Sequence, residues 1–183
     1  EVAEALAAKG INAFVLKYRL QPTVDSLEGF ETQMNQRFAE AAKPANERPV
    51  RPQWNLANQL EDAEAAYALI KSRAKEWNVD MKKIGMMGFS AGAGLTMATT
   101  LQSKKVKLAF IAPIYMFVAI AVDDFLFHGE TGLIKSWYDA KIPVEFHLYQ
   151  NGGHGFGLGN PDRTSNKWFD SFIYWLEVNG FLK

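Results

Sequence analysis

The chain has 183 residues, of which 48% are hydrophobic, so it contains enough apolar material for the core of one domain. Its 20 basic and 20 acidic residues cancel, and a pI near 7.1 argues against nucleic acid or anionic lipid as a partner. The chain has no cysteine, which excludes disulfides, zinc–thiolate sites and thiol nucleophiles, and no apolar run is long enough to span a bilayer.

The first part of the chain is predicted to contain a helix, a strand and a second helix. Residues 1–9 form an amphipathic pattern that ends at Gly10, and because they resemble helix interior we expect the natural chain to continue upstream. Residues 11–18 (INAFVLKY) favour a strand. Residues 58–77 favour a long helix whose apolar stripe consists of Leu60, Ala63, Tyr67, Ile70 and Ala74.

The second half alternates short apolar runs with helical patterns. The predicted strands are residues 83–87, 107–115, 116–122 and 144–149. The predicted helices are residues 93–98, residues 133–140 and a last helix with an inner stripe of Trp168, Phe172, Trp175 and Leu176. Strands that alternate with helices predict an α/β fold, with a mostly parallel sheet covered by helices on both faces, in a single domain over residues 1–183.

Residues 21–55 interrupt this pattern, because connections beyond roughly 15 residues are uncommon in compact domains. Part of this insertion is predicted to be a helix that follows a Ser26 cap, with an apolar stripe of Leu27, Phe30, Met34 and Phe38. Two interpretations stay open: a helical lid or flap near a substrate, and a surface excursion packed by its one stripe.

The junction between Tyr115 and Met116 is also unusual. The two apolar runs that meet there both resemble buried parallel strands, and parallel neighbours need a connection of about a dozen residues. Either residues 107–122 form one long strand, or a segment is missing at the junction. We favour the missing segment. A bonded trans pair has Cα atoms about 3.8 Å apart, which tests this hypothesis.

Residues 88–92 (GFSAG) follow a predicted strand and precede a predicted helix. In that setting the G-x-S-x-G pattern is typical of a nucleophile elbow, a strained turn that exposes the Ser90 hydroxyl. Glycines on both sides are expected because a Cβ on either flank would collide with the neighbouring strand or helix. The N–H of Ala91 is expected to point to where an oxyanion would form.

An acid and a base follow Ser90 in the order that such an elbow needs. Asp123 and Asp124 stand just past the predicted strand 116–122, and His154 lies in a glycine-rich loop after strand 144–149. The other two histidines fit a base less well: His147 is expected to be structural in mid-strand, and His128 to be a loop residue.

Residues 5–20 (ALAAKGINAFVLKYRL), 88–92 (GFSAG), 123–124 (DD) and 152–157 (GGHGFG) together resemble microbial α/β-hydrolase esterases. The likeness is to the endo-xylanase-B-like or acetyl-xylan-type carbohydrate esterases, near the BD-FAE and hormone-sensitive-lipase-like carboxylesterases. It implies a Ser-Asp-His esterase without metal or cofactor, which removes acetyl groups from plant polysaccharides, and it makes a secreted or periplasmic location an expectation.

The resemblance also implies roles for individual residues. Ser90 is the nucleophile, His154 is the general base and acid, and Ala91 supplies one oxyanion N–H. Relatives typically carry the acid as D-x-x-V, which favours Asp124, with Phe127 in the valine position, and leaves Asp123 as the alternative.

Three departures accompany the resemblance. The Gly-rich HGGG-type oxyanion loop of the family would precede Glu1, residues 93–95 (AGL) replace the usual Gly-Gly-His-Leu, and the Ser90 to Asp124 interval is short. Two alternatives remain: a peptidase of the prolyl-oligopeptidase type, which uses the same triad on this fold, and a catalytically inactive binding protein, which the absent loop favours. Three aromatic residues are open to two interpretations, packing or stacking on a sugar or aryl group: Trp54, Trp137 and Phe156.

Overall fold

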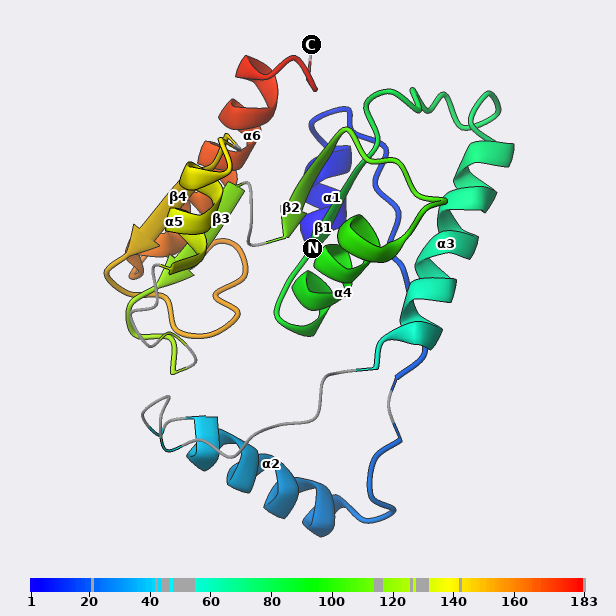
Figure 1. The fold of residues 1–183 in the computed structure, drawn as a ribbon. Coiled ribbons are helices and arrows are strands. Elements are labelled where there is room, and N and C mark those ends of the chain that lie inside the picture. The colour runs from blue at the N-terminus through cyan, green and yellow to red at the C-terminus, as the bar shows by residue number, and fades with distance from the viewer. Residues whose placement is uncertain are drawn as a thin grey trace.

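The computed structural model describes residues 1–20, 22–41, 43, 47, 55–113, 117–125, 127, 132–141 and 143–182. Figure 1 shows their helices and strands. In chain order these are α1 (Val2–Ala7), α2 (Leu27–Ala41), α3 (Ala57–Ser72), β1 (Gly85–Gly88), α4 (Ala91–Gln102), β2 (Phe110–Pro113), β3 (Phe117–Ala121), α5 (Gly132–Asp139), β4 (Glu145–Tyr149), the 3-10 helix η2 (Thr164–Lys167) and α6 (Trp168–Val178).

The strands pair in parallel, as the alternation of strands and helices predicts. β1 pairs with β2, with Gly85 opposite Phe110, and β3 pairs with β4, with Phe117 opposite Glu145. β2 and β3 are in contact, but no ladder joins them among the described residues, so the expected sheet is present here as two parallel pairs. The proposed break between Tyr115 and Met116 lies outside the described residues.

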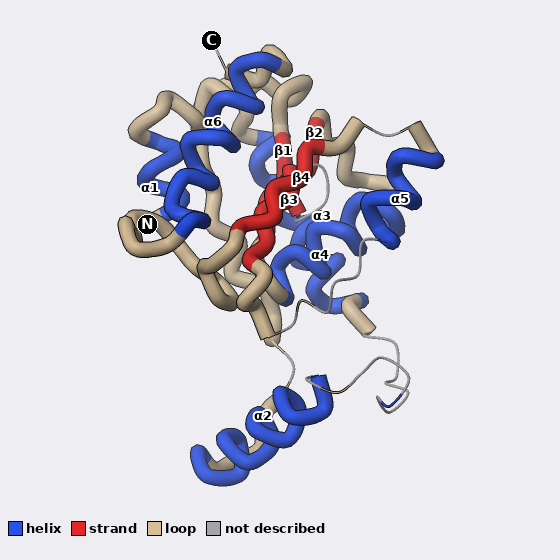
Figure 2. The backbone as a smooth tube through the Cα atoms, turned by 90° about the vertical axis from the view of Figure 1, so that its left-hand side faces the viewer, coloured by secondary structure: helices blue, strands red, loops and turns tan. Residues whose placement is uncertain are grey.

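Helices cover both faces of the strands, as expected. α1 and α6 lie on one side, and α3 and α4 lie on the other (Figure 2). The main core cluster forms where α6 packs against the strands, and Val2 and Leu6 of α1 pack against the same cluster. Its buried members are Ala112, Phe117, Trp168, Phe172, Ile173 and Leu176.

The predicted strand over residues 11–18 is wrong. This segment forms no ladder with any described strand, and two of its apolar side chains are open to solvent: Phe14 is 47% exposed and Val15 81% exposed. Asn12 instead donates its side-chain amide to the carbonyls of Trp77 and Asn78. A hydrophobic, β-branched run makes a strand only where a neighbouring strand accepts its backbone hydrogen bonds, and local sequence does not carry that information.

The long helix predicted over residues 58–77 ends earlier, because α3 stops at Ser72 and turns follow. Residues in the first turns of α3 form hydrogen bonds with Arg19. The guanidinium of Arg19 donates to both carboxylate oxygens of Asp62 and to the carbonyl of Asn58, and the Arg19 N–H donates to Asp62 as well. These hydrogen bonds lower the pKa of Asp62 below its usual value of 3.8. The chain that leads into the insertion is thereby fastened to α3.

The insertion contains the expected helix. Ser26 accepts the N–H of Gly29 through its side chain at 3.0 Å, as a capping residue does, and α2 follows. α2 stands apart from the strands and the other helices, on the side at which β3 and β4 end (Figure 1). Its apolar stripe is open to solvent at Leu27 (74% exposed), Phe30 and Phe38. None of the helices in the described part of the chain has the length and apolar character of a membrane span.

Candidate active site

Ser90 lies in a sharp turn between β1 and α4. Its backbone has φ 50° and ψ −117°, a conformation that non-glycine residues rarely adopt and that the surrounding structure must hold in place. Gly88 makes the turn possible, because a Cβ there would lie 2.2 Å from the carbonyl oxygen of Gly92. The expectation for Gly92 is wrong: a Cβ there would meet no described atom within 4 Å, since this residue lies in the open first turn of α4.

The structure brings Ser90, His154 and Asp124 into one chain of hydrogen bonds. His154 Nδ1 lies 2.9 Å from Asp124 Oδ2, and His154 Nε2 lies 3.1 Å from Ser90 Oγ. An ionised carboxylate only accepts, so Nδ1 carries the imidazole proton and Nε2 accepts from the Ser90 hydroxyl. The three residues follow the carboxyl ends of β1, β3 and β4, the edge at which parallel sheets place their sites.

The two neighbouring aspartates have different contacts. Asp124, whose side chain is 16% exposed, reaches the imidazole. Asp123, the alternative acid, accepts the N–H groups of Gly152 (2.8 Å) and Gly153 (2.7 Å) through one oxygen, Oδ1. Asp123 therefore holds the loop that carries His154, whereas the imidazole itself is hydrogen-bonded to Asp124.

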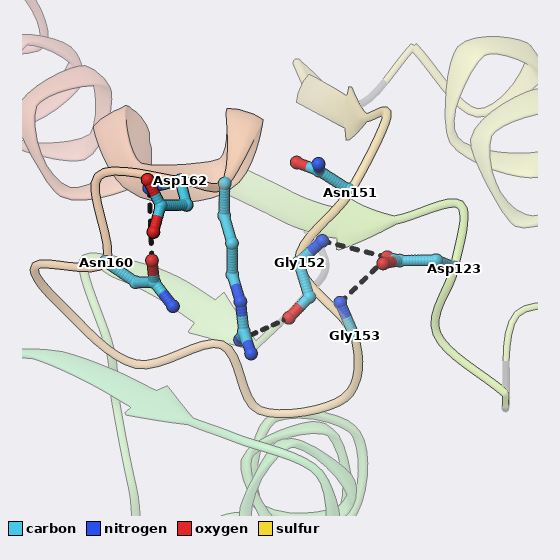
Figure 3. Close-up of a pocket in the computed structure, with 7 residues that line it drawn as sticks. Asp123, Asn151, Gly152, Gly153, Asn160 and Asp162 are labelled. Atoms are coloured by element: carbon cyan, nitrogen blue, oxygen red, sulfur yellow. Dashed lines mark hydrogen bonds between the residues drawn. The ribbon is translucent and has the colours of Figure 1, made fainter.

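The histidine loop is also held from its other side. Arg163 donates to the carbonyl oxygen of Gly152 at 2.7 Å, so this peptide unit is fixed between a carboxylate and a guanidinium (Figure 3). Trp168 Nε1 donates to the carbonyl oxygen of Gly157, which anchors the far end of the loop. Gly153, among other glycines of the loop, has a positive φ, 68°, which a side chain would oppose.

A shallow polar cavity of about 310 Å³ lies beside this clamp (Figure 3). Its lining is Asp123, Asn151, Gly152, Gly153, Asn160, Asp162 and Arg163. Ser90 and His154 do not line it, so the cavity lies beside the residues that support the loop and apart from the hydrogen-bonded chain of Ser90, His154 and Asp124.

The N–H of Ala91 has no hydrogen-bond acceptor among the described residues. The next amide, from Gly92, donates to the carbonyl of Phe89 at 2.8 Å. Ala91 is exposed and stands in the first turn of α4, where backbone N–H groups lack partners within the helix. This N–H is thus available beside Ser90, as the elbow pattern predicts.

An aromatic pair beside His154 was not predicted from the sequence. The Phe125 ring centroid lies 5.3 Å from that of His154, and the Phe38 ring of α2 lies 5.0 Å from Phe125 in an edge-to-face arrangement. A phenylalanine directly after Asp124 was a usable signal for the first contact. No local signal indicated Arg163, which stands in a polar loop 11 residues after Gly152.

The remaining candidates lie elsewhere or have other contacts. His147 is structural, as expected: Nε2 lies 2.8 Å from Glu145 Oε1, and its ring packs against Phe117. Phe156 packs against the rings of Tyr149 and Trp168, which favours packing over a stacking role. Trp137 lies in α5, whereas His128 and Trp54 lie outside the described residues.

Parallel strands between helices, with a serine elbow, an acid and a histidine at their carboxyl ends, define an α/β-hydrolase fold. Comparison with known proteins agrees: residues 49–119 match the model of a family described as having the alpha/beta hydrolase fold. The chain is thus an α/β-hydrolase-fold protein, similar to hydrolase enzymes, as its resemblances predict.

Solved structures give the same result. MGS-M1, an α/β hydrolase enzyme from a Medee basin deep-sea metagenome library, is 28% identical with a TM-score of 0.57, and the match covers 70% of this chain and 67% of that one. An acetyl ester-xyloside bifunctional hydrolase from Caldicellulosiruptor lactoaceticus is 20% identical (TM-score 0.59, 73% and 70% covered). The carboxylesterase Cest-2923 from Lactobacillus plantarum WCFS1 is 17% identical (TM-score 0.54, 73% and 72% covered). The last two show the fold alone. No curated protein matches the chain.

Proposed function

We propose that the protein is a serine carboxylic-ester hydrolase. The observation that carries the proposal is the continuous line of hydrogen bonds from Asp124 through His154 to Ser90, at 2.9 and 3.1 Å. These are the distances at which an imidazole takes a proton from a hydroxyl while a carboxylate holds its other nitrogen. The strained backbone of Ser90 supports the same role, since strain of this kind is typical of sites where a side chain must be presented.

The reaction follows from the positions of these groups. Ser90 Oγ attacks the ester carbonyl carbon as its proton moves to His154 Nε2, and the oxyanion that forms accepts the Ala91 N–H. The imidazolium then gives its proton to the leaving alkoxide, which departs as the alcohol and leaves an acyl group on Ser90. A water molecule, deprotonated by His154, attacks the acyl group and releases the acid. Asp124 stabilises the imidazolium in both halves.

We propose a short acyl group, with acetylated carbohydrate as the substrate class. The support is the resemblance in motifs and one structural neighbour whose name describes an acetyl ester-xyloside hydrolase. An aryl ester such as a feruloyl ester is the nearest alternative substrate. The two other functions share the fold. A peptidase would cleave amide bonds at this site, and an inactive binding protein would cleave no substrate.

The test is the release of p-nitrophenol from p-nitrophenyl acetate by the natural protein, by Ser90→Ala and by Ser136→Ala, a serine of α5 whose hydroxyl donates to the carbonyl of Gly132 within its own helix. We expect activity in the natural protein and in Ser136→Ala, and a loss of about 10⁴-fold or more in Ser90→Ala. Equal rates in all three would overturn the mechanism. Acetyl-xylan, feruloyl esters and aminoacyl anilides then separate the substrate classes.

A further inference from the structure

Two aromatic rings connect the insertion to His154. Phe38, near the end of α2, packs edge to face against Phe125, with 5.0 Å between the ring centroids. The Phe125 centroid in turn lies 5.3 Å from the centroid of the His154 imidazole. Both phenylalanines keep an open surface, 42% exposed for Phe38 and 43% for Phe125. Rings that only filled a core would be buried, so an exposed aromatic surface stands next to His154.

The proton transfer from His154 to the leaving alcohol shows which part of the substrate lies next to this surface. A leaving alcohol oxygen must come within hydrogen-bond reach of Nε2 to take that proton, about 3 Å. The alcohol portion of the ester therefore begins beside the imidazole, whereas the acyl portion begins at Ser90 Oγ. Because Phe125 contacts the imidazole ring, the open aromatic surface borders the alcohol portion.

Hydrogen bonds anchor the chain on both sides of the insertion. Arg19 is bound to α3 through Asp62 and Asn58, and Ser26 caps α2. At its far end, Asn55 accepts the N–H of Ala57 at the start of α3 through its side chain. The segment thus leaves and rejoins the rest of the molecule near the start of α3 (Figure 1), and Phe38 contacts Phe125.

We propose that Phe38 and Phe125 form a subsite for a ring in the alcohol portion of the substrate, such as the pyranose of an acetylated sugar. Aromatic faces pack against the flat C–H face of a ring and offer little to a short open-chain alcohol. This inference rests on the proposed ester hydrolysis. It assigns to the insertion a specificity role.

The test uses two acetates that share the acyl group and differ in the alcohol: an acetylated methyl xylopyranoside and ethyl acetate. Phe38→Ala is expected to raise KM for the xyloside about three- to ten-fold relative to ethyl acetate, with kcat little changed, since a stacking contact binds ground and transition states alike. Phe38→Tyr keeps the ring and is expected to restore KM. Leu27→Ala is the matched control, because Leu27 is an exposed apolar residue of α2 roughly 16 Å away along the helix.

The outcomes separate the subsite from the chemistry. Equal loss of kcat on both acetates in Phe38→Ala would mean that the pair only positions His154, and an unchanged KM ratio would also overturn the subsite. If the natural protein cleaves neither acetate, the proposed hydrolysis fails instead. Binding of methyl xylopyranoside, followed by NMR, then decides the subsite alone: weaker binding to Phe38→Ala than to Leu27→Ala supports it, and equal binding contradicts it.

Discussion

Replacing each of the two neighbouring aspartates by asparagine is expected to lower kcat to very different extents if their contacts define their roles. In Asp124→Asn the imidazolium loses the charge that lies against its Nδ1, where Asp124 Oδ2 stands at 2.9 Å. Two unit charges about 4 Å apart interact by about 4 kcal/mol at an effective dielectric constant near 20, which corresponds to about 10³ in rate. An amide NH₂ turned toward Nδ1 also forces the wrong tautomer, and the combined loss in kcat is expected to approach 10⁴.

Asp123→Asn is the matched control for the same substitution one residue away. Asparagine keeps an oxygen that can accept the N–H groups of Gly152 and Gly153, so the loop bonds persist in weaker, uncharged form. Asp123 is exposed, which limits the effect further. We expect kcat to fall by less than about ten-fold, together with a modest drop in the melting temperature.

The assay is kcat for p-nitrophenyl acetate at neutral pH, with Ser90→Ala as the background and the melting temperature of each variant measured in parallel. The ratio of the two variants is the decisive quantity. If Asp123→Asn loses as much activity as Asp124→Asn, or more, the contact between Asp124 and His154 does not identify the acid and the reasoning fails.

Two further predictions concern the elbow and the anchor of the insertion. Gly88→Ala is expected to lower the melting temperature and abolish activity because its Cβ would collide with backbone, whereas Gly92→Ala, with open space, is expected to leave stability unchanged or slightly higher; equal destabilisation of both variants would contradict this. Asp62→Asn is expected to lower the melting temperature at pH 7, where the bond to Arg19 is intact. Because this bond lowers the pKa of Asp62, its contribution is present above the usual pKa of 3.8 and is lost as the pH falls through the lower pKa of the folded state. The difference from the natural protein should therefore close below about pH 4, and a difference that is constant with pH would contradict it.

The elbow and its helix were predictable because their requirements are local. A strand, a glycine-flanked serine and a helix follow one another within about twenty residues. Gly88 is required in this turn because a Cβ there would collide with the backbone of Gly92. The order of acid and base after Ser90 was equally visible. The choice between Asp123 and Asp124 rested on a resemblance alone, since both follow the same strand and only the direction of each side chain separates them.

The features that were not predicted from the sequence depend on contacts that no local sequence pattern indicates. Residues 11–18 have the composition of a strand, but no described strand pairs with them. Arg163 donates to the carbonyl of Gly152 within one loop region, and Phe38 contacts Phe125 across nearly half of the chain's sequence. None of these contacts produces a periodic sequence pattern, because each joins a single residue of a loop to a single residue of another loop or of a helix.

The most direct test of the account is covalent capture of the nucleophile. Diethyl p-nitrophenyl phosphate transfers its diethylphosphoryl group to an activated serine and releases p-nitrophenolate. We expect one equivalent of p-nitrophenolate per protein chain, the added mass on the peptide that contains Ser90, and neither signal in Ser90→Ala or His154→Ala. Modification of a different residue, or ester hydrolysis that continues while Ser90 is fully modified, would contradict the assignment of Ser90 as the nucleophile.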